Sequence, residues 1–431
     1  MKTNLRLVGA FVVLLFLTAT HVPAHEVRQA LAESFDVLRQ ATWLDDFDGS
    51  FNPAPAEDTW CGDETCGCCS QCSRPLDMWM QVEVLLWWGK GSVVPPLVTT
   101  SNPSNVPRPQ AGVLGFPTTE ILFGDETLGD EVQAGARADF GIWLDPLHNV
   151  GLGVRAYGLE GDADNFFATS AGDPLLARPF FNALLMQEDS LLIAYIDPVD
   201  GPIVDGSIAV NYNSSFNGTD VYTRIMMERC QTNRIDLVGG YSYFRLADNL
   251  NIRSFHTARD VVNNGTTFAI EDTFASSNVF HGGMLGLMGR KARGRWSIDW
   301  LTKVSLGANR QRVRIAGSTV VTPLVGAPNT LPGGLLAQQT NIGTYTNSQT
   351  VVVPELTANL NYHLSSNWSV GVGYNLIWMS STVTAGEQVD RQVNLSQLTG
   401  PLIGPARPAF PGFTTDDYWL MGINMSLRAE Y

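Results

Sequence analysis

The feature that most constrains the fold is the alternation of apolar and polar side chains over residues 418–431. Every second residue there is apolar or aromatic, from Trp419 through Ile423 and Leu427 to Tyr431, and the residues between them become polar or glycine. Alternate side chains of a strand point to opposite faces. The alternating stretch is longer than the roughly 5 or 6 residues of a typical soluble strand. It is also longer than the roughly 9 to 11 residues with which a strand crosses a bilayer. It predicts the closing strand of an all-β protein, a transmembrane antiparallel β-barrel, with a strand of a soluble sandwich as the alternative.

The N-terminus predicts export from the cytoplasm. Lys2 and Arg6 are followed by an apolar run over residues 7–18, and small residues lead to a cleavage site after Ala24. This is the pattern of a secretory signal peptide over residues 1–24. Together with a barrel it predicts that the protein is located in the cell outer membrane.

Composition and motifs exclude several other functions. The net charge is −15 and no basic stripe occurs, so nucleic acid is not an expected partner. No G-x-S-x-G elbow, H-E-x-x-H, P-loop or G-x-G-x-x-G motif before a helix is present. No catalytic, cofactor-binding or metal residue is therefore predicted. His256, His281 and His363 fall on expected strands without marking a triad, and a membrane-embedded hydrolase stays only a third hypothesis.

Residues 25–75 are expected to form a periplasmic N-terminal extension, with a helix over 25–47 followed by a cysteine cluster. The cysteines that could form disulfides are Cys61, Cys66, Cys68, Cys69, Cys72 and Cys230. The cluster spacing C-x4-C-x-C-C-x2-C matches no trusted zinc or ferredoxin pattern. An oxidising compartment favours disulfides, with a metal site and free thiols as alternatives. One clustered cysteine is left over, and it could pair with Cys230 or with another chain.

The outer-membrane β-barrel is predicted over residues 76–431, with about 12 strands. The expected strands are 76–88, 133–144, 150–156, 205–213, 220–229, 234–246, 250–260, 273–289, 294–314, 352–364, 368–380 and 418–431. Their connections alternate mostly between short and long, with 230–233 as the exception. Outer-membrane barrels have short periplasmic turns and longer extracellular loops. The closing strand should therefore end in the periplasm and pair with the strand at 76–88.

Several motifs resemble those of one family. They are Val84-Leu85-Leu86-Trp87-Trp88, Ile121-Leu122-Phe123-Gly124, the stretch 135–145, Ala177-Arg178-Pro179-Phe180, and the stretch 240–246. Together they resemble the putative β-barrel porin family, seventh group, of planctomycete-type outer membranes, over most of residues 76–431. The resemblance implies an outer-membrane barrel and a porin. It assigns no functional residue, because the motifs are strand and turn signals.

The polar face of the expected strands carries charged residues that would point into the lumen. They are Glu83, Arg137, Asp139, Arg155, Arg224, Glu228, Asp236, Asp299, Lys303, Glu355, Arg428 and Glu430. They could line a pore and set its ion preference, or form a salt-bridged network that fills a narrow barrel. The first function hypothesis is passive passage of small solutes or ions. The alternative is a plugged structural or surface-display barrel whose long loops bind envelope components.

Three kinds of partner are expected. The first is outer-membrane lipid, and the second is the small solutes or ions that a porin would pass. The third is the barrel-insertion machinery, for which Trp419, Ile423, Leu427 and Tyr431 would form the assembly signal. The acidic loop segments 124–126 and 129–131 could offer carboxylates to Ca²⁺, but solvated turns are the simpler interpretation, and no metal is predicted.

Overall fold

The computed structural model describes residues 77–161, 163–260 and 263–430. The predicted signal peptide, the N-terminal extension, the five clustered cysteines and Tyr431 lie outside these residues. The strands are β1 (Met78–Gly89), β2 (Ser92–Val94), β3 (Val98–Ser101), β4 (Thr119–Phe123), β5 (Glu126–Leu128), β6 (Gln133–Trp143), β7 (Val150–Leu159), β8 (Ala163–Ser170), β9 (Leu176–Asn182), β10 (Gln187–Asp197), β11 (Gly201–Arg229), β12 (Asn233–Ala258), β13 (Thr267–Arg293), β14 (Trp296–Thr322), β15 (Asn329–Pro332), β16 (Gly343–His363), β17 (Trp368–Thr382), β18 (Gln392–Val393) and β19 (Asp416–Glu430). The helices are the 3-10 turns η2 (Arg108–Gln110) and η3 (Gly386–Gln388) and the short α3 (Ser396–Thr399). None of these described helices is long and apolar enough to cross a membrane.

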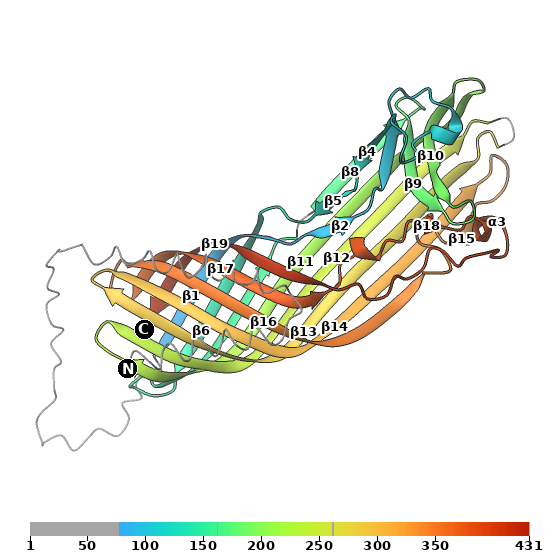
Figure 1. The fold of residues 1–431 in the computed structure, drawn as a ribbon. Helices are drawn as coiled ribbons and strands as arrows, with labels where there is room; N and C mark the ends of the chain where they lie inside the picture. Colours follow the sequence, from blue (N-terminus) through green and yellow to red (C-terminus); the bar gives the residue numbers. More distant parts are fainter. Residues whose placement is uncertain (1–76, 162, 261–262, 431) are drawn as a thin grey trace, which may run out of the picture. The chain divides into compact units, whose positions relative to one another are not determined.

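Ten of the described strands form a closed ring (Figure 1). Their order is β1, β6, β7, β11, β12, β13, β14, β16, β17 and β19, and β19 pairs again with β1. The closing pair is antiparallel, with Met80 opposite Ala429 and Leu86 opposite Ile423. The predicted pairing of the first and last barrel strands is confirmed, and so is the transmembrane β-barrel class.

The expected count of about 12 strands is too high, because two predicted turns do not exist. Residues 214–218 continue β11 and residues 247–249 continue β12, so that Ser214 pairs with Asp248. Asp248 pairs in turn with Ser276 of β13. Serine and aspartate often form turns. Here they stay extended because their side chains point inward, where the Ser276 hydroxyl donates to Asp248.

With ten strands, the connections alternate between short and long without the exception that 230–233 made among the twelve predicted strands. Short connections join β6 to β7, β11 to β12 and β16 to β17, and all lie at the end of the ring that we name the inner end. Long connections lie at the opposite, outer end. The connection 230–232, between β11 and β12, now falls with the other short ones. Short turns are periplasmic and long ones extracellular in outer-membrane barrels.

The long connections carry strands of their own, which the sequence analysis did not predict. β8 pairs with the outer part of β11. β9 pairs with β10, and β3 pairs with both β4 and β9. β18 lies parallel to β9. These strands lie at the outer end of the described fold (Figure 1). The sequences of β8 and β10 do not alternate between apolar and polar residues, so periodicity did not mark them as strands.

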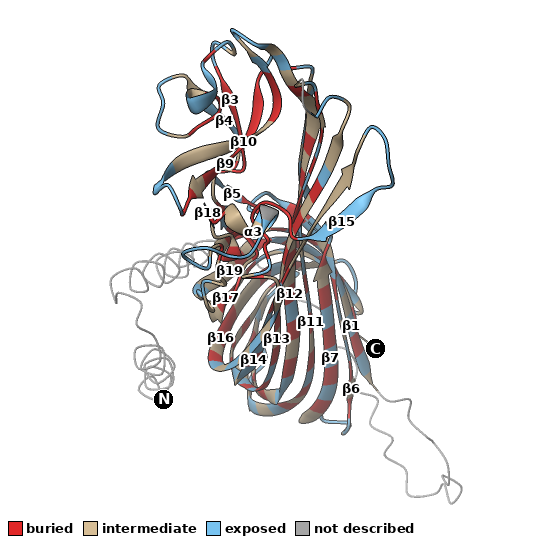
Figure 2. Ribbon diagram, turned by 90° about the vertical axis from the view of Figure 1, so that its right-hand side faces the viewer, coloured by how far each residue is buried: buried red, intermediate tan, exposed pale blue. Residues whose placement is uncertain are grey.

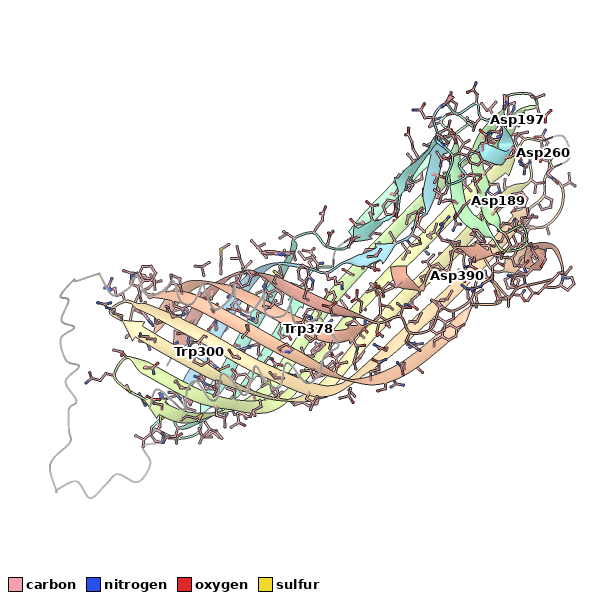
Figure 3. All side chains as sticks on the ribbon, in the orientation of Figure 1. Asp189, Asp197, Asp260, Trp300, Trp378 and Asp390 are labelled. Atoms are coloured by element: carbon pink, nitrogen blue, oxygen red, sulfur yellow. The ribbon has the colours of Figure 1, made fainter. Side chains whose placement is uncertain are left out.

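Burial alternates along the ring strands, as the red and blue bands of Figure 2 show. In β1, Val82 and Val84 are exposed while Glu83 and Leu85 are buried. The exposed apolar residues of the ring include Met78, Met80, Phe140, Leu152, Val154, Val221, Ile225, Tyr241, Leu285, Leu306, Leu360, Val370, Val372, Tyr374, Ile423, Met425 and Leu427. Such an outward apolar band is the lipid-facing surface of a transmembrane barrel. Figure 3 places Trp300 and Trp378 on this outer wall.

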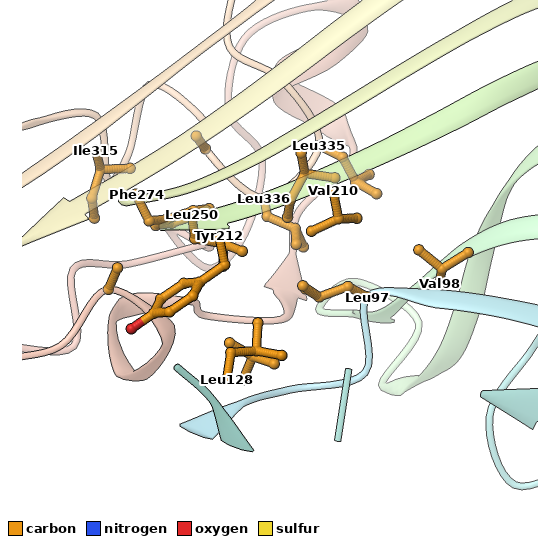
Figure 4. Close-up of a cluster of buried hydrophobic side chains, with 14 of the residues drawn as sticks. Leu97, Val98, Leu128, Val210, Tyr212, Leu250, Phe274, Ile315, Leu335 and Leu336 are labelled. Atoms are coloured by element: carbon orange, nitrogen blue, oxygen red, sulfur yellow. The ribbon is translucent and has the colours of Figure 1, made fainter. Parts of the chain in front are cut away.

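Strands β11 to β14 continue past the ring, and we name their outer portions the strand extension: residues 201–216, 247–258, 267–277 and 309–322. The inner face of the extension carries an apolar cluster beside several buried polar residues. Val210, Leu250, Phe274 and Ile315 pack there with Leu336 from the connection after β15 (Figure 4). Burial of apolar surface contributes about 25 cal/mol of free energy per Å², and this stabilises the packing of these connections against the extension.

Candidate functional site in the barrel interior

Charged side chains from six ring strands meet inside the ring, and we name this set the ion-pair belt. Its members are Glu83 on β1, Arg137 and Asp139 on β6, Arg155 on β7, Asp220 on β11, Lys303 on β14 and Glu355 on β16. Each of them lies on the inward face, because strand alternation sends the neighbouring apolar residues to the lipid. Buried charges are stable only when paired and hydrogen-bonded. Each belt residue is paired in this way.

Arg155 joins opposite walls of the barrel. Its Nε donates to Asp139 Oδ2 at 3.0 Å, and its Nη1 lies 3.3 Å from Glu355 Oε1. β7 and β16, which carry Arg155 and Glu355, are five strands apart in both directions around the ring. A direct ion pair between opposite strands leaves no open path between them at this level.

Lys303 is the second centre of the belt. Its ammonium pairs with Asp220, and also with Glu355 Oε2 at 2.9 Å. Asp220 accepts a further hydrogen bond from Ser242 Oγ at 2.6 Å, and Ser305 donates to Ser242 at 3.1 Å. The sequence reasoning missed Asp220, although it has the same inward parity on β11 as the predicted Arg224.

Glu83 and Arg137 form the third part of the belt. The two side chains pair directly. Arg137 Nη1 also donates to Asn375 Oδ1 at 2.8 Å, and Asn424 Nδ2 donates to Glu83 Oε1 at 2.7 Å. Asn375 and Asn424 are fully buried, and the sequence reasoning missed them because only charged residues were considered. Their amides satisfy the acceptors that the arginine leaves over.

Toward the inner end, two smaller ion-pair clusters contain further predicted lining residues. Arg224 Nη2 lies 2.5 Å from Asp236 Oδ2. Asp299 pairs with Arg290 at 2.9 Å and with Arg428 at 2.9 Å.

Two predicted lining residues of this end differ in their surroundings. Glu430 pairs with Arg290 at 3.0 Å. Among the described residues Glu228 forms no ion pair, and the register of β11 against β12 shifts between Met226 and Glu228. Its contact is with the thiol of the exposed Cys230, at 3.9 Å.

Above the belt, an apolar layer fills the ring. Leu85, Trp87, Phe244, Phe280 and Leu420 are buried there, from β1, β12, β13 and β19. The rings of Phe244 and Phe280 stack with centroids 4.5 Å apart. This layer has the close-packed character of a protein core. It separates the belt from the outer mouth of the barrel.

The chain that follows β17 enters this mouth, and we name residues 381–388 the mouth segment. The Val383 carbonyl accepts from Asn278 Nδ2 at 2.8 Å and from Ser276 Oγ at 2.9 Å. The Ala385 N–H donates to Asp248 Oδ2 at 2.7 Å. Burial raises the pKa of the Asp248 carboxyl to about 6, against the lowering effect of the Ala385 N–H.

A buried ion pair links β9 to the strand extension. Arg178 Nη2 lies 2.5 Å from Asp272 Oδ2, and both side chains are inaccessible to solvent. The backbone N–H groups of Leu336 and Ala337 also donate to Asp272. Nearby, burial and the charge of Arg178 lower the pKa of His256 to about 4. No local pattern marks this cluster, since its members are far apart in sequence.

The remaining predicted residues have simple surroundings. Ile423 and Leu427 of the proposed assembly signal are exposed on the outer wall, and Trp419 is half-buried. In the acidic segment 124–126, Glu126 accepts from the Gly124 N–H at 3.2 Å. The Asp164 carboxylate accepts from the Gly129 N–H at 2.9 Å. The first contact is local to the turn, whereas the second joins the segment after β5 to β8.

The described outer end also has a surface cavity of about 490 Å³. Phe181 and Val389 form apolar walls, and the guanidinium groups of Arg391 and Arg407 lie beside them. Arg391 pairs with Glu188 at 2.7 Å. Arg407 pairs at 2.8 Å with Asp390, which Figure 3 labels. Apolar walls with a few polar groups are typical of small-molecule sites.

The family comparison agrees with the barrel. The family described as putative beta barrel porin-7 (BBP7) matches residues 79–431. The outer membrane protease OmpT from Escherichia coli is 8% identical, with a TM-score of 0.40, covering 83% of this chain and 98% of that one. A FadL homologue from Pseudomonas aeruginosa is 8% identical (TM-score 0.20; 83% and 90%), and the CymD monoaromatic hydrocarbon channel is 7% identical (TM-score 0.18; 82% and 88%). No curated protein matches the sequence.

Proposed function

We propose that this chain, which belongs to the putative beta barrel porin-7 family, works as a closed outer-membrane barrel that anchors an extracellular binding surface. In this role the ring holds the outer strands and the mouth segment at the cell surface. The cavity beside Phe181 is then one place where an envelope component could bind. The role is non-catalytic, and it differs from free diffusion through an open pore.

One observation carries this proposal: the ion pair of Arg155 and Glu355 spans the ring between opposite strands. A barrel of about 8 strands is filled by its side chains, whereas 16 to 18 strands leave an aqueous channel. Ten strands belong near the filled limit. The apolar layer and the mouth segment add two further barriers above the belt.

Planar-bilayer recording tests the proposal. The folded protein should give no channel steps, because three layers block the ring. The double variant Arg155→Ala with Glu355→Ala should admit water at the belt. It should give a small conductance only when Phe244 and Phe280 of the apolar layer are also replaced by alanine and residues 381–388 by a short glycine linker. The matched control Arg253→Ala with Glu271→Ala removes an ion pair from the outer wall, and it should stay silent. Steady conductance from the parent protein would refute the closed barrel.

A second candidate function is passage of small ions or solutes, as the family description suggests. The observation in its favour is that the belt consists of side chains alone, so that rotamer changes could open it without unfolding a strand. The same recordings distinguish the candidates. Brief openings of the parent protein that become more frequent when Lys303 is replaced by methionine would favour gated passage, because the substitution removes two ion pairs that hold the belt closed.

Export and assembly complete the proposal. We expect residues 1–24 to direct the chain to the envelope and the apolar face with Trp419, Ile423 and Leu427 to engage the insertion machinery. Removal of residues 1–24 should leave the protein in the cytoplasm. Replacement of Ile423 and Leu427 by serine should lower the amount of heat-modifiable barrel in outer-membrane fractions. Unchanged amounts in both cases would contradict these two roles.

A further inference from the structure

Three arginines stand on the outer wall of β14, where the strand leaves the ring, and we name them the arginine row. Arg310, Arg312 and Arg314 are exposed, and they alternate with the buried Gln311 and Val313. Alternation places the three guanidinium groups on the same outward face. That face is the one that presents Leu306 to lipid.

The position of the row relative to the membrane follows from strand geometry. Between Trp296 and Ala308 the outward face of β14 is apolar or small apart from Thr302. At ~3.3 Å per residue this stretch is about 40 Å long. A tilt of about 45° gives it a height of ~28 Å, close to the ~25 Å of the lipid-facing band of such barrels. Arg310, the first residue of the row, therefore lies where the hydrocarbon layer ends, at the level of the lipid headgroups.

The surroundings of the row have the chemistry of a phosphate site. On β16, Ser348 lies opposite Arg310 and Thr346 opposite Arg312, and these hydroxyl residues are exposed as well. Among the described residues no carboxylate forms an ion pair with the row, although the whole chain has a net charge of −15. Most other arginines of the fold are paired. Guanidinium groups bind phosphate bidentately, and hydroxyl groups add further donors.

Arg245 extends the same surface toward β12. It is exposed, and it follows the outward Tyr241 of the lipid-facing band by four residues. Arg245 pairs with Val279 of β13, three residues before Gly282, which lies against Gly307 of β14. A cationic surface thus begins just above the apolar band on more than one strand.

We infer that the arginine row binds the phosphate groups of anionic lipids in the outer leaflet, while the apolar wall below it contacts their acyl chains. A flexible polymer or a soluble phosphate would use the guanidinium groups alone. A lipid uses both surfaces, and their direct succession along β14 favours it. The inference goes beyond the closed barrel, because it would hold for an open barrel as well.

Native mass spectrometry of the full refolded chain tests the site. The protein is placed in dodecyl maltoside micelles that contain either phosphatidic acid or phosphatidylcholine with the same acyl chains. The parent protein should retain phosphatidic acid preferentially. The triple variant R310Q/R312Q/R314Q should retain it about tenfold less, with no change for phosphatidylcholine. High salt should reduce the parental binding, since exposed charges are screened.

Two controls make the result decisive. The variant R229Q/R253Q/R259Q removes the same charge from exposed arginines elsewhere, two of which already pair with carboxylates, and it should bind as the parent does. The variant R310K/R312K/R314K keeps the charge and should retain about half or more of the bound lipid. Heat-modifiable gel mobility verifies folding of each variant.

Several outcomes would overturn the inference. One is equal retention of phosphatidic acid by the parent and R310Q/R312Q/R314Q. Another is an equal loss in the control triple variant, which would indicate net charge rather than a site. Complete displacement of the lipid by inorganic phosphate, but not by sodium chloride of equal ionic strength, would show a site for soluble anions instead.

Discussion

Strand β14 crosses two regions of the molecule, and the polarity of its faces inverts between them. Within the ring, Leu306 is exposed while Lys303 is buried in ion pairs. In the strand extension, Arg312 is exposed while Val313 is fully buried. The same inversion occurs along β11, where Asp220 is buried in the ring and Val210 is buried in the extension.

The surrounding medium explains the difference. Lipid covers the ring, so apolar side chains can remain on its outer wall, and charged side chains leave the lipid by pairing inside, below the apolar layer. Water covers the extension, so apolar side chains gather on its inner face. A single strand therefore follows two opposite patterns. The boundary between the patterns locates the membrane surface.

The largest expected effect comes from breaking the belt. Lys303→Met leaves Asp220 and Glu355 buried without their cation, and it should cost about 3–5 kcal/mol of unfolding free energy. Urea unfolding from lipid vesicles, followed by tryptophan fluorescence, measures it. The exposed Lys291→Met should change the value by less than about 0.5 kcal/mol. A similar small loss for Lys303→Met would mean that the belt does not stabilise the ring.

A charge introduced on the outer wall tests whether lipid or water covers each region. Val372→Arg faces lipid in the ring and should cost about 2–4 kcal/mol near the middle of the membrane. Thr346→Arg faces water beside the extension, and its cost should stay within about 0.5 kcal/mol. The same unfolding experiment compares the two variants. Equal costs would place the membrane boundary elsewhere.

Acid should weaken the extension through His256. Its pKa of about 4 in the folded state lies below the ordinary 6.5, so the unfolded chain takes up the proton first as the pH falls. Stability is then complete above pH 6.5 and decreases between pH 6.5 and 4, by about 1–3 kcal/mol. His256→Phe should remove this part of the pH dependence, because the two chains share every other titrating group. Parallel pH profiles would exclude His256 as the cause.

The smallest expected effect is on the outer wall of the extension. Arg253 and Glu271 pair at 3.0 Å, but both side chains are exposed. Arg253→Gln should cost no more than about 0.5 kcal/mol, because water screens such pairs. Measured beside Lys303→Met, it compares an ion pair in water with one inside the ring. A cost above about 2 kcal/mol would show that the pair is less exposed than described.

Periodicity alone predicted much of the ring, and its limits have physical causes. The alternation in β1 and β19 predicted both the strands and their pairing, because a lipid-facing surface tolerates few exceptions. The continuity of β11 and β12 was missed, since serine, asparagine and aspartate serve equally in turns and on an inward polar face. The pair of Arg178 and Asp272 was missed because only the folded chain brings them together.

The seam between β1 and β19 has a consequence for the order of assembly. The seam joins strands from opposite ends of the described chain, such as Met80 to Ala429, whereas neighbouring strands β16 and β17 are joined by a short turn. Contacts between distant residues form late, since the loop-closure entropy is lost before the contacts can compensate for it. We therefore expect hairpins such as β16–β17 to form early and the seam to form last. Until then both edge strands remain unpaired, and a chain stalled at that stage would be prone to join the edge of another copy.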